Sequence, residues 1–170
     1  MKALILIANG FEDLSLFVPW YRLREEGVEV VLASPLMCGV VGQHGYRVEP
    51  DVPVHEISPS EYDLLVIPDG SATEFLRVRE EVVAVVRTFV QENRVAAIGH
   101  GAQLLISAGA LDGKTVTCAP GIRDDVRAAG ATYRDEAIVI DSGLLTGRGP
   151  DDLPPFCREL ARMVKPLRIR

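Results

Sequence analysis

The chain has 170 residues, of which 48% are hydrophobic and 25% are charged, and its formal net charge is -6. This length and composition predict one globular domain large enough to bury a core, and they exclude a disordered or fibrous protein. The negative charge, without a basic stripe to neutralise phosphates, argues against nucleic acid as a partner.

The N-terminal residues 1–10 contain one lysine and a short apolar run. That run is shorter than a signal-peptide core with its cleavage site, and it is too short to span a membrane. The chain has three cysteines, an odd number that cannot all pair in disulfides. They lie far apart and form no zinc-binding motif: Cys38, Cys118 and Cys157. We therefore expect a cytosolic protein with no membrane contact, no disulfide framework, no metal and no cofactor.

Short aliphatic runs alternate with segments of helical periodicity, which is typical of a mostly parallel sheet covered by helices. Strands are expected at residues 2–8, 28–34, 62–68, 95–98 and 137–141, where nearly every residue is apolar, as in strands buried on both faces. Residues 40–48, interrupted by Gly42 and Gly45, are expected to form a peripheral hairpin.

Helical periodicity fills the intervals between these strands. The first helix places Leu14, Phe17 and Tyr21 on one face and contains Pro19, which predicts a kink. We find no repeat and no linker, so residues 1–170 are expected to form a single domain. The expected helices are residues 12–26, 80–92, 100–108, 122–129 and 151–164.

Three loops follow strands and carry polar or glycine residues, at residues 8–12, 67–71 and 98–101. Ligands of open α/β sheets bind outside the carboxyl ends of the strands, so these loops mark the expected site. In the third loop a strand runs directly into the helix near His100, which is the setting of a nucleophile elbow. The small residues Gly99, Gly101 and Ala102 permit so sharp a turn.

With these features the chain resembles the PfpI family of intracellular proteases, in the glutamine-amidotransferase-like superfamily that includes the Parkinson's-associated deglycase. The resemblance covers nearly the whole chain. It implies an α/β fold, a flavodoxin-like three-layer sandwich, that assembles as homodimers and in some members as hexamers. The matching segments are residues 8–13, 21–27, 44–46, 98–105, 107–109, 120–125 and 150–154.

The resemblance also assigns roles to individual residues. The family elbow reads Cys-His-Gly, so Gly99 stands at the position of the nucleophilic cysteine and His100 at that of the histidine. Glu12 matches the glutamate that lowers the pKa of the thiol. Glu74 matches a glutamate that an adjacent subunit contributes to orient the histidine. The helper residues are present, whereas the nucleophile position is vacant.

Two further positions depart from the family pattern. The family has Gly-Gly after the third strand, where backbone N–H groups face an oxyanion; here the pair reads Asp69-Gly70, and a carboxylate would repel an oxyanion. A Tyr or His precedes the proline of a later loop in the family, where this chain has Ala119 beside Cys118. We expect Gly70, Gly101, Cys118 and Ala119 to line the substrate pocket.

Each candidate residue also has a structural interpretation. Glu12 and His100 are either catalytic groups or residues that help begin a helix. Asp69 either joins them in acid–base chemistry or in binding a divalent metal, or it fills the space that a thiol would occupy. Cys118 is either a relocated nucleophile or a buried structural cysteine.

Three functions remain open at this point. The first is a stress-related binding or regulatory protein that has lost thiol-dependent peptidase, glyoxalase or deglycase activity and holds a small molecule. The second is a hydrolase, hydratase or lyase that uses Glu12, Asp69 and His100 on a small electrophile. The third is a thiol enzyme disabled by a substitution at residue 99 of this sequence alone.

Overall fold

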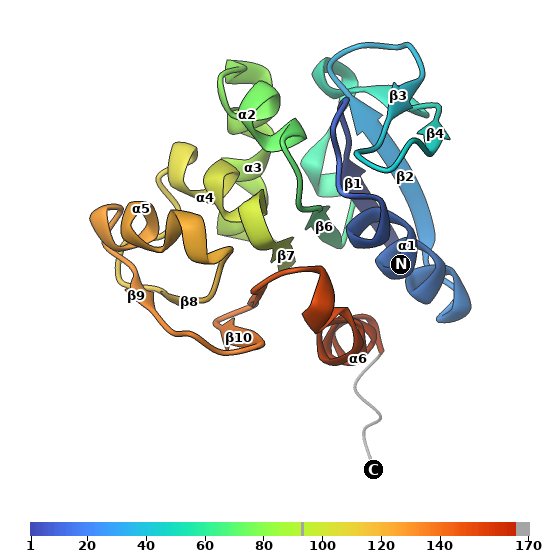
Figure 1. Cartoon of the computed structure of the whole chain (residues 1–170). Helices are drawn as coiled ribbons and strands as arrows, with labels where there is room; N and C mark the ends of the chain where they lie inside the picture. Colours follow the sequence, from blue (N-terminus) through green and yellow to red (C-terminus); the bar gives the residue numbers. More distant parts are fainter. Residues whose placement is uncertain (93, 166–170) are drawn as a thin grey trace.

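The aliphatic runs of the sequence become the strands of one central sheet in the computed structural model, which describes residues 1–92 and 94–165 (Figure 1). Neighbouring strands are parallel except for the first two of the order below, which form an antiparallel hairpin at one edge. This confirms the mostly parallel sheet. Across the sheet the strands are β10 (Ile138–Asp141), β11 (Leu144–Gly147), β7 (Arg94–Ile98), β6 (Leu64–Ile67), β1 (Lys2–Leu6), β2 (Glu29–Ser34) and β5 (Val52–Pro53).

Helices cover both faces of the sheet and complete the three layers (Figure 1). On one face α1 (Asp13–Glu25) packs against α6 (Leu153–Val164). Helix α3 (Glu80–Glu92) lies on the other face. Its residues Val82, Val86 and Phe89 recur at helical spacing and form the side that the helix buries. Beside α3 lie α2 (Ala72–Arg77) and α4 (Ala102–Ser107), and α5 (Arg123–Ala128) packs against α4.

Two small sheets lie outside the central one. The first is the predicted hairpin, in which β3 (Val40–Val41) pairs antiparallel with β4 (Arg47–Val48). The second pairs β8 (Thr115–Val116) with β9 (Thr132–Tyr133) in parallel. Short 3₁₀ turns complete the described part of the chain, at Val54–Glu56, Pro59–Glu61, Gly99–Gly101, Pro120–Ile122 and Pro150–Asp152.

The face of α1 that carries Leu14 and Tyr21 is largely exposed. Leu14 and Tyr21 are more than half exposed, while Leu16, Pro19 and Leu23 are the residues that the helix buries. The helix is continuous through Pro19. Leu14 and Tyr21 therefore lie on the surface, while Phe17 between them is half-buried and packs against the core.

Strands β5, β8, β9 and β11 and helix α2 were not predicted from the sequence. The apolar run of strand β11 consists of two leucines, which is too short to be recognised as a strand from the sequence. Helix α2 has six residues and directly follows the loop at residues 67–71. Among the described residues, no helix is both long and apolar enough to cross a membrane.

Candidate active site

Three strand ends meet at one edge of the sheet and form the candidate site. The peptide N–H of Glu12, in the loop after β1, donates to the carbonyl oxygen of Asp69 after β6 at 2.8 Å. The register of β6 and β7 places Ile67 opposite Ala97, so Asp69 and Gly99 extend their strands side by side. The strand ends that the sequence argument singled out thus lie next to one another.

Gly99 begins the 3₁₀ turn after β7 and has a φ of +53°, a left-handed conformation that side chains rarely adopt. A Cβ atom at this position would lie 2.1 Å from Oδ2 and 2.3 Å from Cγ of Asp69. The carboxylate of Asp69 therefore occupies the space into which a side chain at residue 99 would extend.

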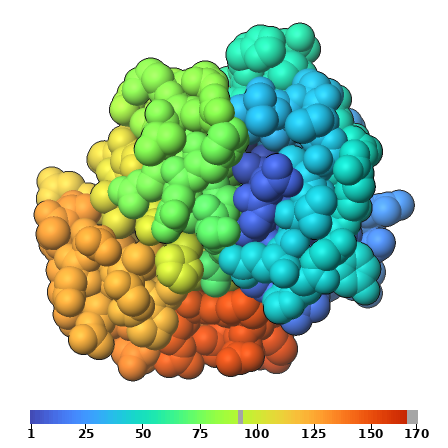
Figure 2. Space-filling model, turned by 45° about the horizontal axis from the view of Figure 1, so that its top comes forward, coloured from blue at the N-terminus to red at the C-terminus, as the bar shows by residue number. Residues whose placement is uncertain are grey.

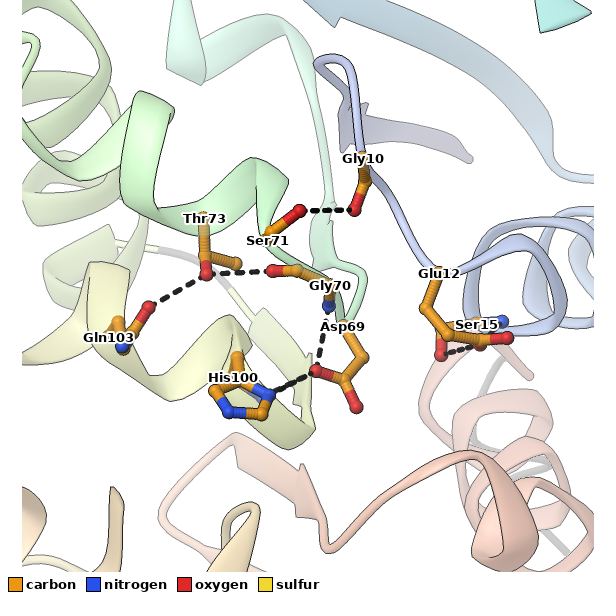
Figure 3. A network of polar contacts seen from close by, with 9 residues as sticks. All are labelled: Gly10, Glu12, Ser15, Asp69, Gly70, Ser71, Thr73, His100 and Gln103. Carbon is orange, nitrogen blue, oxygen red and sulfur yellow. Dashed lines mark hydrogen bonds and ion pairs between the residues drawn. The ribbon is translucent and has the colours of Figure 1, made fainter. Parts of the chain in front are cut away.

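The buried carboxylate of Asp69 is held by three donors, and Figure 3 draws its contacts with Gly70 and with the ring of His100. Its Oδ1 accepts hydrogen bonds from the peptide N–H groups of Gly70 at 2.7 Å and of His100 at 2.8 Å. The same oxygen lies 2.8 Å from Nδ1 of His100. The second oxygen, Oδ2, accepts no hydrogen bond from the described residues, and Figure 3 shows it turned away from His100 and Gly70.

These groups line an open pocket of about 360 Å³. In Figure 2 the green segment meets the dark-blue N-terminal segment and the orange-red segment near the middle of this face. The sequence argument had already identified four members of the lining as catalytic candidates and Gly70 as a substrate-binding one. The full lining is Glu12, Gln43, Asp69, Gly70, Ser71, Thr73, Glu74, His100, Gln103 and Pro150.

The profile of the DJ-1/PfpI family matches residues 1–163. The chain belongs to the DJ-1/PfpI family. A protein of Archaeoglobus fulgidus without an assigned function is 49% identical over 166 residues, covering 97% of this chain and 99% of its own. The relative named deglycase PfpI, from Pyrococcus furiosus, is 43% identical over 166 residues, covering 97% and 100%.

Solved structures of DJ-1/PfpI proteins share the fold. A two-domain protein of Anabaena variabilis, with DJ-1/ThiJ/PfpI-like and ferritin-like domains, superposes with a TM-score of 0.92 at 36% identity. The match covers 95% of this chain and 47% of that one, so the chain spans about half of the two-domain protein. DJ-1 of Schizosaccharomyces pombe gives a TM-score of 0.90 at 21% identity, covering 98% and 93%. These matches confirm the flavodoxin-like sandwich.

The imidazole of His100 lies at the mouth of the pocket, with 44% of its side chain exposed. Its hydrogen bond with Asp69 raises the pKa of His100 above the usual value, although partial burial opposes this shift. The negative charges of Asp69 and of Glu74 raise the pKa further. Asp69 thus holds the ring at Nδ1. An imidazole held in this way can act as a general base or carry a positive charge.

Replacing Asp69 with asparagine should lower the pKa of His100 toward about 6.5, because the ring loses its anionic partner. A raised folded-state pKa means that protonated His100 stabilises the fold. That contribution is complete below the unfolded-state pKa and is lost as the pH rises through the folded-state pKa. NMR titration of the histidine Cε1 protons measures this shift, with His44 and His55 as internal references. An unchanged pKa of His100 would contradict the assigned interaction.

Glu12 is the N-cap residue of α1 as well as a member of the pocket lining. Its carboxylate accepts hydrogen bonds from the peptide N–H groups of Leu14 at 3.2 Å and Ser15 at 2.7 Å, and from the hydroxyl of Ser15. Figure 3 shows the carboxylate of Glu12 directed at Ser15. In this DJ-1/PfpI protein the glutamate thus has the helix-capping role that the sequence allowed.

Glu12→Ala should lower the free energy of unfolding by about 1–2 kcal/mol, because the first turn of α1 loses its cap. Glu12→Gln should cost less, since the amide oxygen still accepts a hydrogen bond. Urea denaturation measures both variants. Equal stability of Glu12→Ala and the unaltered protein would exclude the capping role.

Cys118 and Ala119 are buried and are not among the residues that line the pocket. Burial raises the pKa of the Cys118 thiol to about 12, with a smaller contribution from Asp125. A thiol with so high a pKa is protonated at neutral pH, so the geometry fits the structural interpretation of Cys118. Gly101, the last residue of the turn, is buried and is also not in the lining, and a Cβ there would come within 2.7 Å of the carbonyl oxygen of Ile67.

Some of the pocket was missed by sequence reasoning. Thr73 and Gln103 are both buried, and the Thr73 hydroxyl lies 2.8 Å from Oε1 of Gln103. Gln103 belongs to a matching family segment, which was the one available signal. Within residues 1–92 and 94–165, no three His, Cys, Asp or Glu side chains are placed to hold a metal ion.

Proposed function

We propose that this DJ-1/PfpI protein has lost the thiol chemistry that the family resemblance implies and has kept the pocket as a small-molecule binding site, in a regulatory, stress-related role. One observation carries the proposal. The space at residue 99 where a nucleophile would extend is filled by the carboxylate of Asp69.

Two features of the site support this proposal. The peptide N–H groups of Gly70 and His100 both donate to Asp69 and are not free to stabilise an oxyanion. Glu12 is committed to capping α1. Relatives that are 43% identical carry the name deglycase, so loss of that activity would be a departure within a close group.

The proposal is tested by incubating the unaltered protein with methylglyoxal and measuring lactate, which simple adduct formation does not release. The expected result is no lactate above the buffer rate. Lactate production in proportion to protein concentration would overturn the proposal, whichever side chain was responsible.

A second candidate function is supported by the pairing of His100 with Asp69. An aspartate that orients an imidazole and raises its basicity is a common arrangement for general acid–base catalysis. The candidate reaction is hydration or lysis of a small carbonyl compound. It predicts a turnover that is lost in Asp69→Asn, and a screen without any turnover would remove it.

We also propose that the chain forms a homodimer through the exposed face of α1 and the β3–β4 hairpin, on which hexamers could build. Leu14, Tyr21 and Tyr46 are each more than half exposed. The ring of Phe17 lies 5.4 Å from that of Tyr46 and 6.4 Å from that of Tyr21, which joins the helix and hairpin into one aromatic surface. A second copy of the chain would cover this surface.

Tyr21→Glu should convert the dimer to a monomer, because a charge would be buried at the contact. Val78→Glu, at another exposed apolar residue, is the matched control and should stay dimeric. Sedimentation velocity distinguishes the two forms. A dimer that survives Tyr21→Glu would contradict this interface.

The proposed compartment is the cytosol. Cys38, Cys118 and Cys157 are free thiols in the structure, and Cys38 is exposed. Reducing compartments preserve such thiols, whereas an exposed thiol outside the cell tends to oxidise.

A further inference from the structure

The backbone donors of the pocket are already occupied by an anion that belongs to the protein. Oδ1 of Asp69 accepts from the peptide N–H groups of both Gly70 and His100, and His100 belongs to the turn that begins at Gly99. An anionic ligand would have to displace this carboxylate to reach them. The pocket is therefore poorly suited to carboxylates, phosphates and oxyanions.

The free oxygen of the same carboxylate points to the opposite kind of ligand. Asp69 is only 7% exposed, yet its Oδ2 accepts no hydrogen bond from the described residues. Oδ2 is not among the fully buried atoms that lack a partner in the described residues, so it is open to the solvent of the pocket, where a charged donor of a ligand can pair with it. Since the side chain lines the pocket, that donor can enter from the open side.

The charges around the pocket agree with this. Three of the residues in the lining are carboxylates, Glu12, Asp69 and Glu74, and none of the described residues in the lining is Lys or Arg. His100 contributes at most one positive charge. The lining is thus negative in either protonation state of His100.

We infer that the pocket binds a small organic cation, through a primary ammonium group that donates to Oδ2 of Asp69. This inference rests on the proposed binding function and names its ligand class. An ammonium group brings three donors, one of which can serve Asp69, while the exposed carboxylate of Glu74 in the same lining adds electrostatic attraction. The volume of about 360 Å³ suits a small molecule, since such sites span roughly 300–1,000 Å³.

Isothermal titration calorimetry with three four-carbon probes tests the inference. The probes are 1,4-diaminobutane, 1,4-butanediol and succinate, which are cationic, neutral and anionic at neutral pH. The diamine should bind at one site, the diol at least about tenfold more weakly, and succinate without detectable heat.

Variants distinguish this site from general attraction to an acidic protein. Asp69→Asn should weaken diamine binding roughly ten- to hundredfold, because a charge-assisted hydrogen bond is lost while the amide can still accept from Gly70 and His100. Glu74→Gln should weaken it by a smaller factor. Glu56→Gln removes one exposed negative charge away from the pocket and should change the affinity by less than about twofold.

The inference is overturned if the diol binds as tightly as the diamine, if the diamine does not bind, or if Asp69→Asn and Glu56→Gln lose the same affinity. Those results would leave the proposed loss of thiol chemistry standing. Release of lactate from methylglyoxal would instead overturn the proposed function, so the two failures are distinguishable.

Discussion

Gly99→Cys on its own is expected to give a protein that is destabilised and inactive toward methylglyoxal. The new Cβ would lie 2.1 Å from Oδ2 of Asp69, and the residue would have to keep a φ of +53°. Backbone strain of this kind costs about 1–3 kcal/mol, and displacing Asp69 would break hydrogen bonds worth on the order of 1 kcal/mol or more each. We expect a loss of roughly 3 kcal/mol in the free energy of unfolding.

The double variant Asp69→Gly with Gly99→Cys should behave in the opposite way. It removes the obstructing carboxylate and frees the peptide N–H groups of Gly70 and His100 for an oxyanion. Because one such donor contributes about 10²–10³ in rate, lactate formation should rise at least about 100-fold above that of the unaltered protein. Asp69→Gly with Gly99→Ser is the matched control without a thiol. Equal activity of Gly99→Cys and the double variant would contradict the obstruction by Asp69.

Gly70→Ala is expected to cause the second large effect, a loss of about 3 kcal/mol or more in the free energy of unfolding. The residue has a φ of +116°, and a Cβ would lie 2.4 Å from the carbonyl oxygen of Gly10 and 2.5 Å from the peptide nitrogen of Glu12. Both contacts are to backbone, which cannot move without opening the hydrogen bond between Glu12 and Asp69.

Gly113→Ala is the control for that variant. Gly113 has a φ of +71°, but a Cβ there would meet no atom within 4 Å. The free energy of unfolding of Gly113→Ala should therefore fall by only about 1 kcal/mol, because the left-handed conformation is the single unfavourable feature of this variant. Urea denaturation compares the two, and similar losses would show that crowding at the loop junction is unimportant.

Much of the fold could be predicted from the sequence, because its signals are local. Residues 80–92 have apolar residues at helical spacing, and α3 has these same bounds. The aliphatic runs at β1, β6 and β7 are buried on both faces and stand out by composition. Strand β11 could not be recognised, since its two leucines gain their strand conformation by pairing with β7.

The position of the candidate site could be predicted from the sequence, but the orientation of its side chains could not. The rule that ligands bind at strand ends grouped Glu12, Asp69 and His100, and all three line one pocket in the structure. The direction of each carboxylate depends on tertiary contacts. Glu12 turns to the N-terminus of α1, and Asp69 reaches a turn 31 residues away because the register of β6 and β7 sets the two loops side by side.

The occupation of the backbone donors by Asp69 can be measured directly by amide hydrogen exchange, followed by NMR at Gly70 and His100. In the unaltered protein both amide protons should be protected, and in Asp69→Ala both should exchange at least about tenfold faster while the amides of α3 keep their rates. Exchange at Gly70 and His100 that is as fast in the unaltered protein as in Asp69→Ala would show that the carboxylate does not hold these donors.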